Sequence, residues 1–178
     1  MNDVENRMNL FKLGFMAILS LLFVSSLQAK GMDPYAYKAF TDFDGKKYSL
    51  NDVRGKGKWL IVMVWRHDCH VCNQEVGQYM KFHSKNKDSL ATVLGITLDG
   101  VAGKKKASAF IKRHKVNFPN LLVDNSTFSD LYRAFSGKQF RGTPTIIIFS
   151  RDGTHKGQQP GAVPTSIIEK FAKDNDKK

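Results

Sequence analysis

Both cysteines of the chain lie in the stretch WRHDCHVCNQE, residues 65–75, three positions apart. Cys69 and Cys72 are interleaved with His67 and His70, so the stretch combines thiol, metal-binding and proton-transfer chemistry. Three kinds of site fit these residue types: a pair that exchanges disulfides, a metal site, and a structural bridge. A bridge between the two cysteines would close a very small loop. Because the stabilisation from a disulfide grows with loop length, the purely structural role is disfavoured.

A metal-binding module, such as a copper carrier, is the main alternative to a redox pair. Thiolate and imidazole ligands suit Cu(I) and zinc. However, Cys69 and His70 are adjacent at the start of a predicted helix and point to different faces. A distant ligand would be needed, and the candidates are the histidines at positions 67, 83, 114 and 155. The sequence therefore favours a redox pair that needs no metal or other cofactor.

Two further cysteine chemistries fit the sequence poorly. Haem attachment through CxxCH is excluded because Asn73, not His, follows Cys72. A peroxiredoxin needs Thr or Ser three residues before its reactive Cys and Pro further upstream, where this chain has Arg66 and Val62.

The elements around the cysteines alternate between strand and helix. WLIVMVW, residues 59–65, is a continuous apolar run that is typical of a strand buried on both faces. A helix over 69–85 follows it. Further strands are predicted at 92–99, 120–123, 145–149 and up to about 158, and further helices at 104–115, 126–136 and 164–173. YKAFTDFDGKKYSL, with its Asp44-Gly45 turn, predicts an N-terminal β-hairpin. Strands that alternate with helices indicate a mixed central sheet flanked by helices.

These elements put the two cysteines in different environments. The strand ends at Trp65, and after a short turn Cys69 begins the helix, with Cys72 one turn inside it. Free amides and the helix dipole at this terminus stabilise a thiolate at Cys69. A protonated His70 would add to this effect, whereas Asp68 would oppose it. A CxxC pair in a βαβ context is the redox signature of thioredoxin-like proteins.

A second motif, RGTPT, occupies residues 141–145 just before the strand TIIIF. Thr143-Pro144 at the mouth of a strand is a position where a cis peptide bond is used. The alternative is a trans proline that merely starts the strand. The combination of buried strand, CxxC, helix and a later Thr-Pro before a strand is far more specific than either motif alone.

Over roughly residues 35–175 the chain resembles the exported thioredoxin-like proteins of the TlpA/ResA type. The matching stretches are FTDFDGKKYSLNDVRGK, WLIVMVW, CHVC with Glu75 three residues later, GTPT and FSRDGT. The resemblance implies a thioredoxin-like fold with an N-terminal β-hairpin. It also implies a bacterial periplasmic or membrane-tethered thiol–disulfide oxidoreductase, often a reductant that acts in cytochrome c maturation or on copper-site thiols.

The resemblance assigns a role to each matching residue. Cys69 is the nucleophile, Cys72 the resolving thiol, and Pro144 the cis-proline that faces them. Glu75 is a nearby carboxylate that handles protons, and the alternative for it is a favourable charge in the first turns of the helix. The residues expected at the substrate-binding surface are Thr143, His70 and Trp65.

Three features depart from the family pattern. Asp68 stands where the family usually has Trp, and the dipeptide His70-Val71 lacks the frequent Pro. Met63 stands where thioredoxin itself has a buried Asp. A tenfold change in the redox equilibrium corresponds to only about 30 mV. The fold is therefore expected to hold, while the potential and the direction of electron flow stay open.

The N-terminus predicts export. Residues 13–24 form an apolar run after the basic residues Arg7 and Lys12, and the small residue Ala29 stands at the expected cleavage point. Residues 1–29 are thus predicted to be a signal peptide, followed by a thioredoxin-like domain over 30–178. The alternative is an uncleaved membrane anchor, although the run is short for a span of about 20 residues. Either way the expected location is the periplasm.

The chain is strongly basic, with 28 Lys and Arg against 16 Asp and Glu and a formal net charge of +12. No nucleic-acid-binding motif accompanies this charge, so a solvated basic surface is the first interpretation, and an acidic partner or an anionic membrane surface is the alternative. The expected partners are the thiols and disulfides of exported proteins, together with a membrane-bound electron donor.

Overall fold

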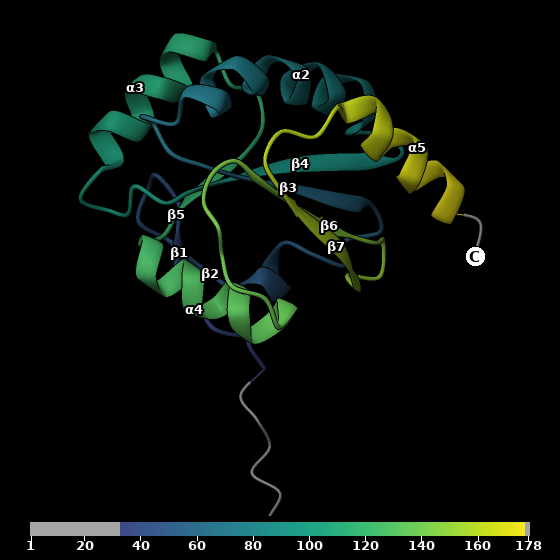
Figure 1. The fold of residues 1–178 in the computed structure, drawn as a ribbon, viewed down its shortest axis with the longest axis horizontal. Helices are drawn as coiled ribbons and strands as arrows, with labels where there is room; N and C mark the ends of the chain where they lie inside the picture. The colour runs from purple at the N-terminus through teal and green to yellow at the C-terminus, as the bar shows by residue number, and fades with distance from the viewer. Residues whose placement is uncertain (1–32, 177–178) are drawn as a thin grey trace, which may run out of the picture. The chain divides into compact units, whose positions relative to one another are not determined.

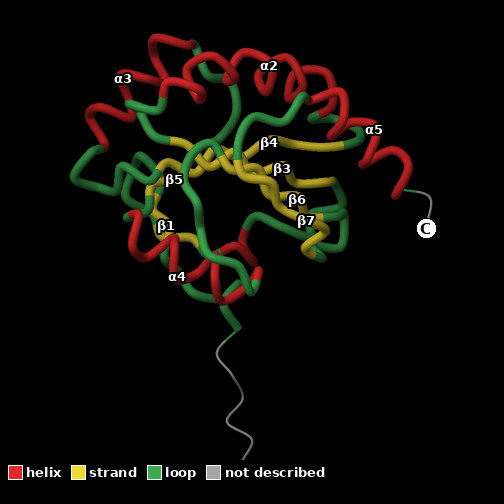
Figure 2. The backbone as a smooth tube through the Cα atoms, in the orientation of Figure 1, coloured by secondary structure: helices red, strands yellow, loops and turns green. Residues whose placement is uncertain are grey.

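The computed structural model describes residues 33–176, so the predicted signal peptide lies outside the described residues. Seven strands form one central sheet in the order β2-β1-β5-β4-β3-β6-β7, with helices on both of its faces (Figures 1 and 2). The strands are β1 (Phe40–Thr41), β2 (Lys47–Tyr48), β3 (Trp59–Trp65), β4 (Ala91–Thr97), β5 (Asn120–Leu122), β6 (Thr145–Phe149) and β7 (His155–Pro160). β3, β4 and β5 are parallel, whereas β1, β2, β6 and β7 pair with their neighbours in antiparallel fashion. The predicted mixed sheet is confirmed.

The helices divide between the two faces of this sheet. α2 (His70–Asn86), α3 (Lys104–His114) and α5 (Thr165–Asn175) cover one face, and α4 (Asn125–Ser136) covers the other together with the short 3-10 helix η1 (Leu50–Asp52) (Figure 1). Alternate residues of β3 serve the two faces, as the period of a strand requires. Ile61 and Met63 pack with residues of α2, α3 and α5, whereas Val62 and Val64 pack with residues of α4 and η1.

The fully buried strand β3 explains why its sequence reads as an unbroken apolar run. All seven of its residues are buried, because helices cover the sheet on both sides at this position. The predicted bounds of the helices and longer strands agree with the structure to within a few residues. The predicted hairpin is also present, but its strands β1 and β2 have only two residues each. Gly45 supplies the positive φ of 95° that its tight turn requires.

The register of the sheet brings distant segments to one edge. Trp65, the last residue of β3, lies opposite Thr97, the last residue of β4. On its other side β3 runs antiparallel to β6, and Val64 lies opposite Thr145. The loop after β3, the loop after β4 and the segment before β6 therefore meet at the same end of the sheet.

No helix within residues 33–176 combines the length and the apolar composition that a membrane crossing demands.

Candidate active site

Cys69 and Cys72 form a disulfide at the start of α2, with a Cα–Cα distance of 5.2 Å. Cys69 is the N-cap residue of the helix, as predicted, and its Sγ accepts a hydrogen bond from the backbone N–H of Cys72 at 3.1 Å. Cys72 is 0% exposed, whereas Cys69 is only partly buried. A reagent from solvent can therefore reach only the first of the two sulfurs.

The turn before Cys69 is closed by a backbone hydrogen bond of 3.2 Å from the N–H of Cys69 to the carbonyl of Arg66. The Arg66 guanidinium pairs with the Asp68 carboxylate at 3.1 Å, and both side chains are about half exposed. Partial burial acts to raise the pKa of Asp68, but the adjacent guanidinium outweighs it and the net shift is downward. Because these two charges offset each other, the unfavourable effect expected of Asp68 on a Cys69 thiolate is largely cancelled.

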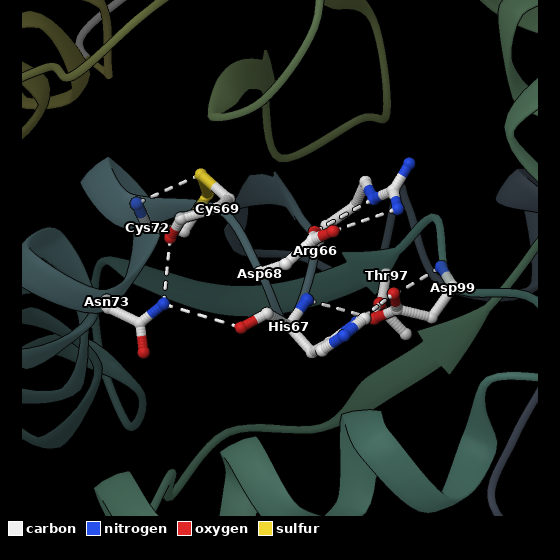
Figure 3. A network of polar contacts seen from close by, with 8 residues as sticks. All are labelled: Arg66, His67, Asp68, Cys69, Cys72, Asn73, Thr97 and Asp99. Carbon is white, nitrogen blue, oxygen red and sulfur yellow. Dashed lines mark hydrogen bonds and ion pairs between the residues drawn. A yellow bond between two sulfur atoms is a disulfide. The ribbon is translucent and has the colours of Figure 1, made fainter.

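His67, in the same turn, is bound twice by Asp99. Its backbone N–H donates to Oδ2 at 3.0 Å and its ring Nδ1 contacts Oδ1 at 2.6 Å (Figure 3). Thr97 adds a third hydrogen bond, from Oγ1 to Oδ2 at 2.6 Å. Sequence reasoning considered His67 only as a distant metal ligand and missed Asp99. The sole local signal for Asp99 is that it follows a buried strand of an α/β sheet, where polar groups of a site gather.

Asn73 forms a second support of the site, on the side of α3. Its Nδ2 donates to the carbonyl of Cys69 at 2.8 Å and, more weakly, to that of His67 at 3.4 Å (Figure 3). Its Oδ1 lies 2.8 Å from Nη2 of Arg113 and 2.9 Å from Nε2 of His114. The residue that excluded haem attachment thus links the redox turn to the C-terminal end of α3.

One group of potential metal ligands lies near the cysteines but contains neither of them. One ligand atom each of His67, Asp68 and Asp99 lies within 4.8 Å of the others. Both carboxylates already accept hydrogen bonds from protein donors, Asp68 from Arg66 and Asp99 from His67 and Thr97. The arrangement fits a hydrogen-bond network better than an ion site, so the copper-carrier alternative gains no support from it.

The Thr143-Pro144 bond is cis, as predicted. Pro144 is buried and directly precedes Thr145, which lies opposite Val64 near the end of β3. The Pro144 carbonyl accepts a hydrogen bond from Gly161 N–H at 2.8 Å. Within residues 33–176, neither the N–H nor the carbonyl of Thr143 has a backbone partner. Thr143 itself is partly exposed, so its main chain is available at the edge that carries the cysteines.

The remaining expected site residues occupy three different environments. Glu75 lies one turn after Cys72 on α2, is partly buried, and accepts a hydrogen bond from Gln78. His70 is the exposed first residue of α2. Trp65 is only 1% exposed, and its indole N–H donates to Asn120 at 3.0 Å. Burial favours a supporting role for Trp65 over the substrate contact that we expected.

A CxxC disulfide that caps the helix after the central strand, with a cis-proline at the same sheet edge, defines a thioredoxin-like thiol–disulfide oxidoreductase. The chain belongs to the AhpC/TSA family, whose profile matches residues 33–156. The chain is similar to the thiol-disulfide oxidoreductase ResA of Bacillus subtilis, in line with the resemblance noted in the sequence. The two are 26% identical over 134 residues, which make up 73% of this chain and 67% of that protein. The ResA of one Bacillus cereus strain is 26% identical over 113 residues, 64% of this chain and 60% of the relative's length.

Solved structures support the fold. The thioredoxin domain of a Bacteroides vulgatus thiol-disulfide oxidoreductase superposes with a TM-score of 0.60 at 23% identity, over 78% of this chain and 97% of that one. A secreted disulfide oxidoreductase of Mycobacterium tuberculosis gives a TM-score of 0.59 at 18% identity, over 79% and 97%. The expected thioredoxin-like fold is confirmed.

Proposed function

We propose that this chain exchanges disulfides with exported protein substrates and works as a reductant. In the dithiol form the Cys69 thiolate attacks one sulfur of a substrate disulfide, and the other substrate sulfur leaves as a thiolate. The Cys72 thiolate then attacks Cys69 Sγ and expels the second substrate thiolate. The products are the 69–72 disulfide and a reduced substrate, so two electrons pass from the protein to the substrate.

The observation that carries this proposal is the unequal exposure of the two sulfurs. Cys69 stands partly exposed at a helix N-terminus, where its Sγ accepts the N–H of Cys72, whereas Cys72 is 0% exposed. Free amides at a helix N-terminus stabilise an anion, so the Cys69 thiolate is favoured over that of Cys72. The two-step exchange requires that the exposed thiol react with substrate first and that the buried thiol react second. The unequal exposure of Cys69 and Cys72 fits this order.

The free main chain of Thr143 supports a substrate-binding role for the segment before β6. An extended peptide can pair with an unpaired N–H and carbonyl by adding a short strand at this edge. His70 is exposed beside Cys69, so such a peptide would also contact its side chain. The substrate disulfide would then lie between the Thr143 main chain and the Cys69 sulfur.

Glu75 is the candidate for handling the proton of Cys72. The two residues are three positions apart on one helix and so share a face. Burial first, and then the negative charge of Glu75, raise the pKa of Tyr79 well above its usual value. Glu75 therefore exerts its charge within the buried side of α2, which is where the Cys72 thiol must lose its proton before it attacks.

The basic face of α3 supports an acidic protein partner. Residues 100–123 contain six Lys or Arg and no Asp or Glu, and all six are exposed. Lys104, Lys105 and Lys106 occupy the first turn of α3, where positive charge opposes the helix dipole. Arg113 connects this face to the site, because it hydrogen-bonds Asn73, which holds the Cys69 carbonyl. Acidic residues around the substrate disulfide would complement this surface.

Export and the reducing direction rest on the predicted signal over residues 1–29 and on the resemblance to the exported TlpA/ResA-type proteins. A reductant in an oxidising compartment must be recharged after each turnover. A membrane-bound donor of two electrons is therefore the partner that the cycle requires, and maturation of cytochrome c is the process that the resemblance suggests.

A trapping experiment tests the exchange mechanism. Reduced Cys72→Ser should accumulate a mixed disulfide with an added disulfide-containing protein, and a reductant should release it. Cys69→Ser is the matched control and should trap almost nothing. Equal trapping by both variants would contradict the assigned roles. Equilibration with glutathione then gives the direction, since a potential near −270 mV is typical of a reductant and one near −120 mV of an oxidant.

A pair of synthetic peptides tests the acidic partner. Two cyclic disulfide peptides that differ only in flanking Asp or Lys residues should be reduced at different rates, with the acidic one faster. The difference should shrink as salt is raised, because salt screens exposed charges. Equal rates, together with binding of the protein to vesicles of anionic lipid, would favour the membrane surface instead.

A further inference from the structure

His67 and Asp99 make a double contact in the turn before Cys69. One carboxylate accepts from both the backbone N–H and the ring Nδ1 of the same residue, at 3.0 Å and 2.6 Å. Such a contact restrains the backbone and the side-chain torsions of His67 together. Figure 3 shows the His67 ring pointing toward Thr97 and Asp99, on the side away from the Cys69 sulfur. The ring is therefore placed to hold the turn, and a direct proton transfer to Cys69 does not fit its direction.

Asp99 is itself anchored to the rigid part of the sheet. It lies two residues beyond the end of β4, its carbonyl accepts Gly103 N–H at 3.0 Å, and it forms an isolated bridge with Asp124. Thr97, which is 0% exposed, donates to its carboxylate. The contact therefore links the turn at residues 66–69 to the central sheet. Turns open locally more easily than the strands of a central sheet.

The Asp99 carboxylate is costly to keep where it lies. Its side chain is 2% exposed, and within residues 33–176 the His67 ring is the only basic group in contact with it. A buried carboxylate loses its hydration, and well-packed apolar residues often stabilise a fold as much as a buried ion pair does. Three donors offset the loss here. The geometry that this carboxylate imposes on its donors is therefore a better candidate for its role than a gain in stability.

That geometry bears on Cys69 through the turn that precedes the helix. The turn runs from Arg66 to Cys69 and is closed by the 3.2 Å backbone hydrogen bond between them, so His67 is its first central residue. When His67 is held, the turn can deliver Cys69 only to the N-cap position of α2. In the disulfide form the covalent bond to Cys72 adds a second restraint. In the dithiol form that bond is absent, and the position of the Cys69 sulfur depends on the turn together with the hydrogen bonds from Asn73 and Cys72.

We propose that Asp99 is a positioning residue that acts through His67 to hold the turn bearing Cys69, chiefly in the dithiol form. Loss of the contact should lower the free energy of unfolding of the dithiol form more than that of the disulfide form. The redox equilibrium should then move toward the disulfide, and attack on a substrate should slow, because a misplaced nucleophile loses rate steeply. The inference about rate rests on the proposed exchange function, whereas the inference about stability does not.

His67→Ala and His67→Asn separate positioning from proton chemistry. The Asn side chain can donate to Asp99 much as Nδ1 does, but it does not titrate, and Ala cannot donate. Neither substitution removes the Asp99 charge. His67→Ala should slow exchange about tenfold or more and shift the equilibrium with glutathione about tenfold toward the disulfide, which is about 30 mV. His67→Asn should recover most of both losses.

Melting temperatures of the two redox forms supply a readout that needs no substrate. His67→Ala should lower the melting temperature of the dithiol form more than that of the disulfide form. Asp124→Asn is the matched control, since Asp124 is exposed, follows the neighbouring strand β5 and makes no side-chain cap hydrogen bond. This substitution removes a nearby carboxylate without changing His67. It should leave the melting temperatures of both redox forms and the reduction potential as in the wild type.

Three results would overturn the proposal. The first is a His67→Asn variant as impaired as His67→Ala, which would assign proton chemistry to the ring. The second is an equal fall in melting temperature for both redox forms. The third is an Asp124→Asn variant that reproduces the shift in potential, which would indicate a general charge effect. If the wild type exchanges no disulfide, the proposed function fails, and the melting temperatures still decide the positioning role.

Discussion

The sulfur of Cys69 accepts a hydrogen bond from the backbone N–H of Cys72 at 3.1 Å, in addition to the covalent bond between the two sulfurs. The donor belongs to the first turn of α2, so we expect it to remain in place when the disulfide is reduced. Within residues 33–176 no hydrogen bond reaches the sulfur of Cys72, which is 0% exposed. In the proposed mechanism, Cys72 thus supplies both the resolving thiol and a donor that stabilises the attacking thiolate.

This asymmetry predicts the order of alkylation. In the reduced protein, iodoacetamide at mildly acidic pH should modify Cys69 well before Cys72, because the helix terminus and its amides lower the pKa of the first thiol. Peptide mass mapping at short reaction times measures the order. Modification of Cys72 first would reverse the assigned roles and would show that the helix terminus does not control reactivity in this protein.

The second prediction concerns metal. The protein isolated in air should contain no stoichiometric zinc or copper and should show no free thiol until it is reduced. The reason is that Cys69 and Cys72 are joined as a disulfide, and thiolate ligands are therefore absent. Elemental analysis with a thiol assay measures both quantities. One tightly bound metal per chain that is lost in both Cys69→Ser and Cys72→Ser would favour the carrier instead.

The third prediction concerns stability in weak acid. His83 is 7% exposed, and its Nδ1 accepts the backbone N–H of Val93 at 3.1 Å. Burial first, and then the positive charge of Lys87, lower the pKa of His83. The imidazole of His83 is therefore harder to protonate in the folded state than in the unfolded state, where it binds a proton below about pH 6.5. The contribution of His83 to stability is present above that pH and is lost as the pH falls, at up to about 1.4 kcal/mol per pH unit.

Urea unfolding between pH 7 and pH 5 tests the role of His83. Burial also lowers the pKa of His114 and His155, so His83→Gln should remove a part of the pH dependence and leave the rest. His70→Gln, at an exposed position of the same helix, is the control and should keep the wild-type slope. An unchanged slope in His83→Gln would mean that this buried imidazole does not resist protonation.

The fourth prediction concerns the end of α5. Asp176 accepts the indole N–H of Trp59 at 2.9 Å, and its other oxygen accepts from Arg151 at 2.7 Å. Hydrogen bonds from Arg151 first and Trp59 second lower the pKa of Asp176 to about 2. Because the folded pKa is depressed, this stabilisation is present above about pH 4 and is lost as the pH falls toward 2.

Asp176→Asn should therefore destabilise the protein at pH 7 by on the order of 1 kcal/mol, since the pair is partly solvated and screened. The variant and the wild type should converge in stability only as the pH falls to about 2. Thermal unfolding at both pH values measures the difference. Asp174→Asn removes a more exposed carboxylate of the same helix and should have a smaller effect. A constant gap between Asp176→Asn and the wild type at all pH values would contradict the ionic account.

Local patterns in the sequence were sufficient to predict the elements of the fold. β3 has an unbroken apolar run because both faces of the sheet are covered, and the helices show the spacing of a single apolar face. The position of Cys69 at the start of α2 and the Thr143-Pro144 bond were also predictable. Each depends on residues that are neighbours along the chain, so the signal for each lies within one short stretch.

The supports of the site were decided only by the tertiary structure. Asp99 lies 32 residues from His67 along the chain, and Arg113 lies 40 residues from Asn73. No local pattern marks either pair, because an aspartate after a strand or an asparagine in a helix has many equally ordinary partners. Trp65, expected to bind substrate, is 1% exposed because α3 packs over it through Phe110, a contact that the sequence does not reveal. Sequence alone pointed to Cys69 and Cys72 as the residues proposed to carry the redox chemistry, and to Pro144 beside them. The register of β3 against β4 and the packing of α3 on the sheet determined which residues hold them, because such contacts exist only after distant segments are brought side by side.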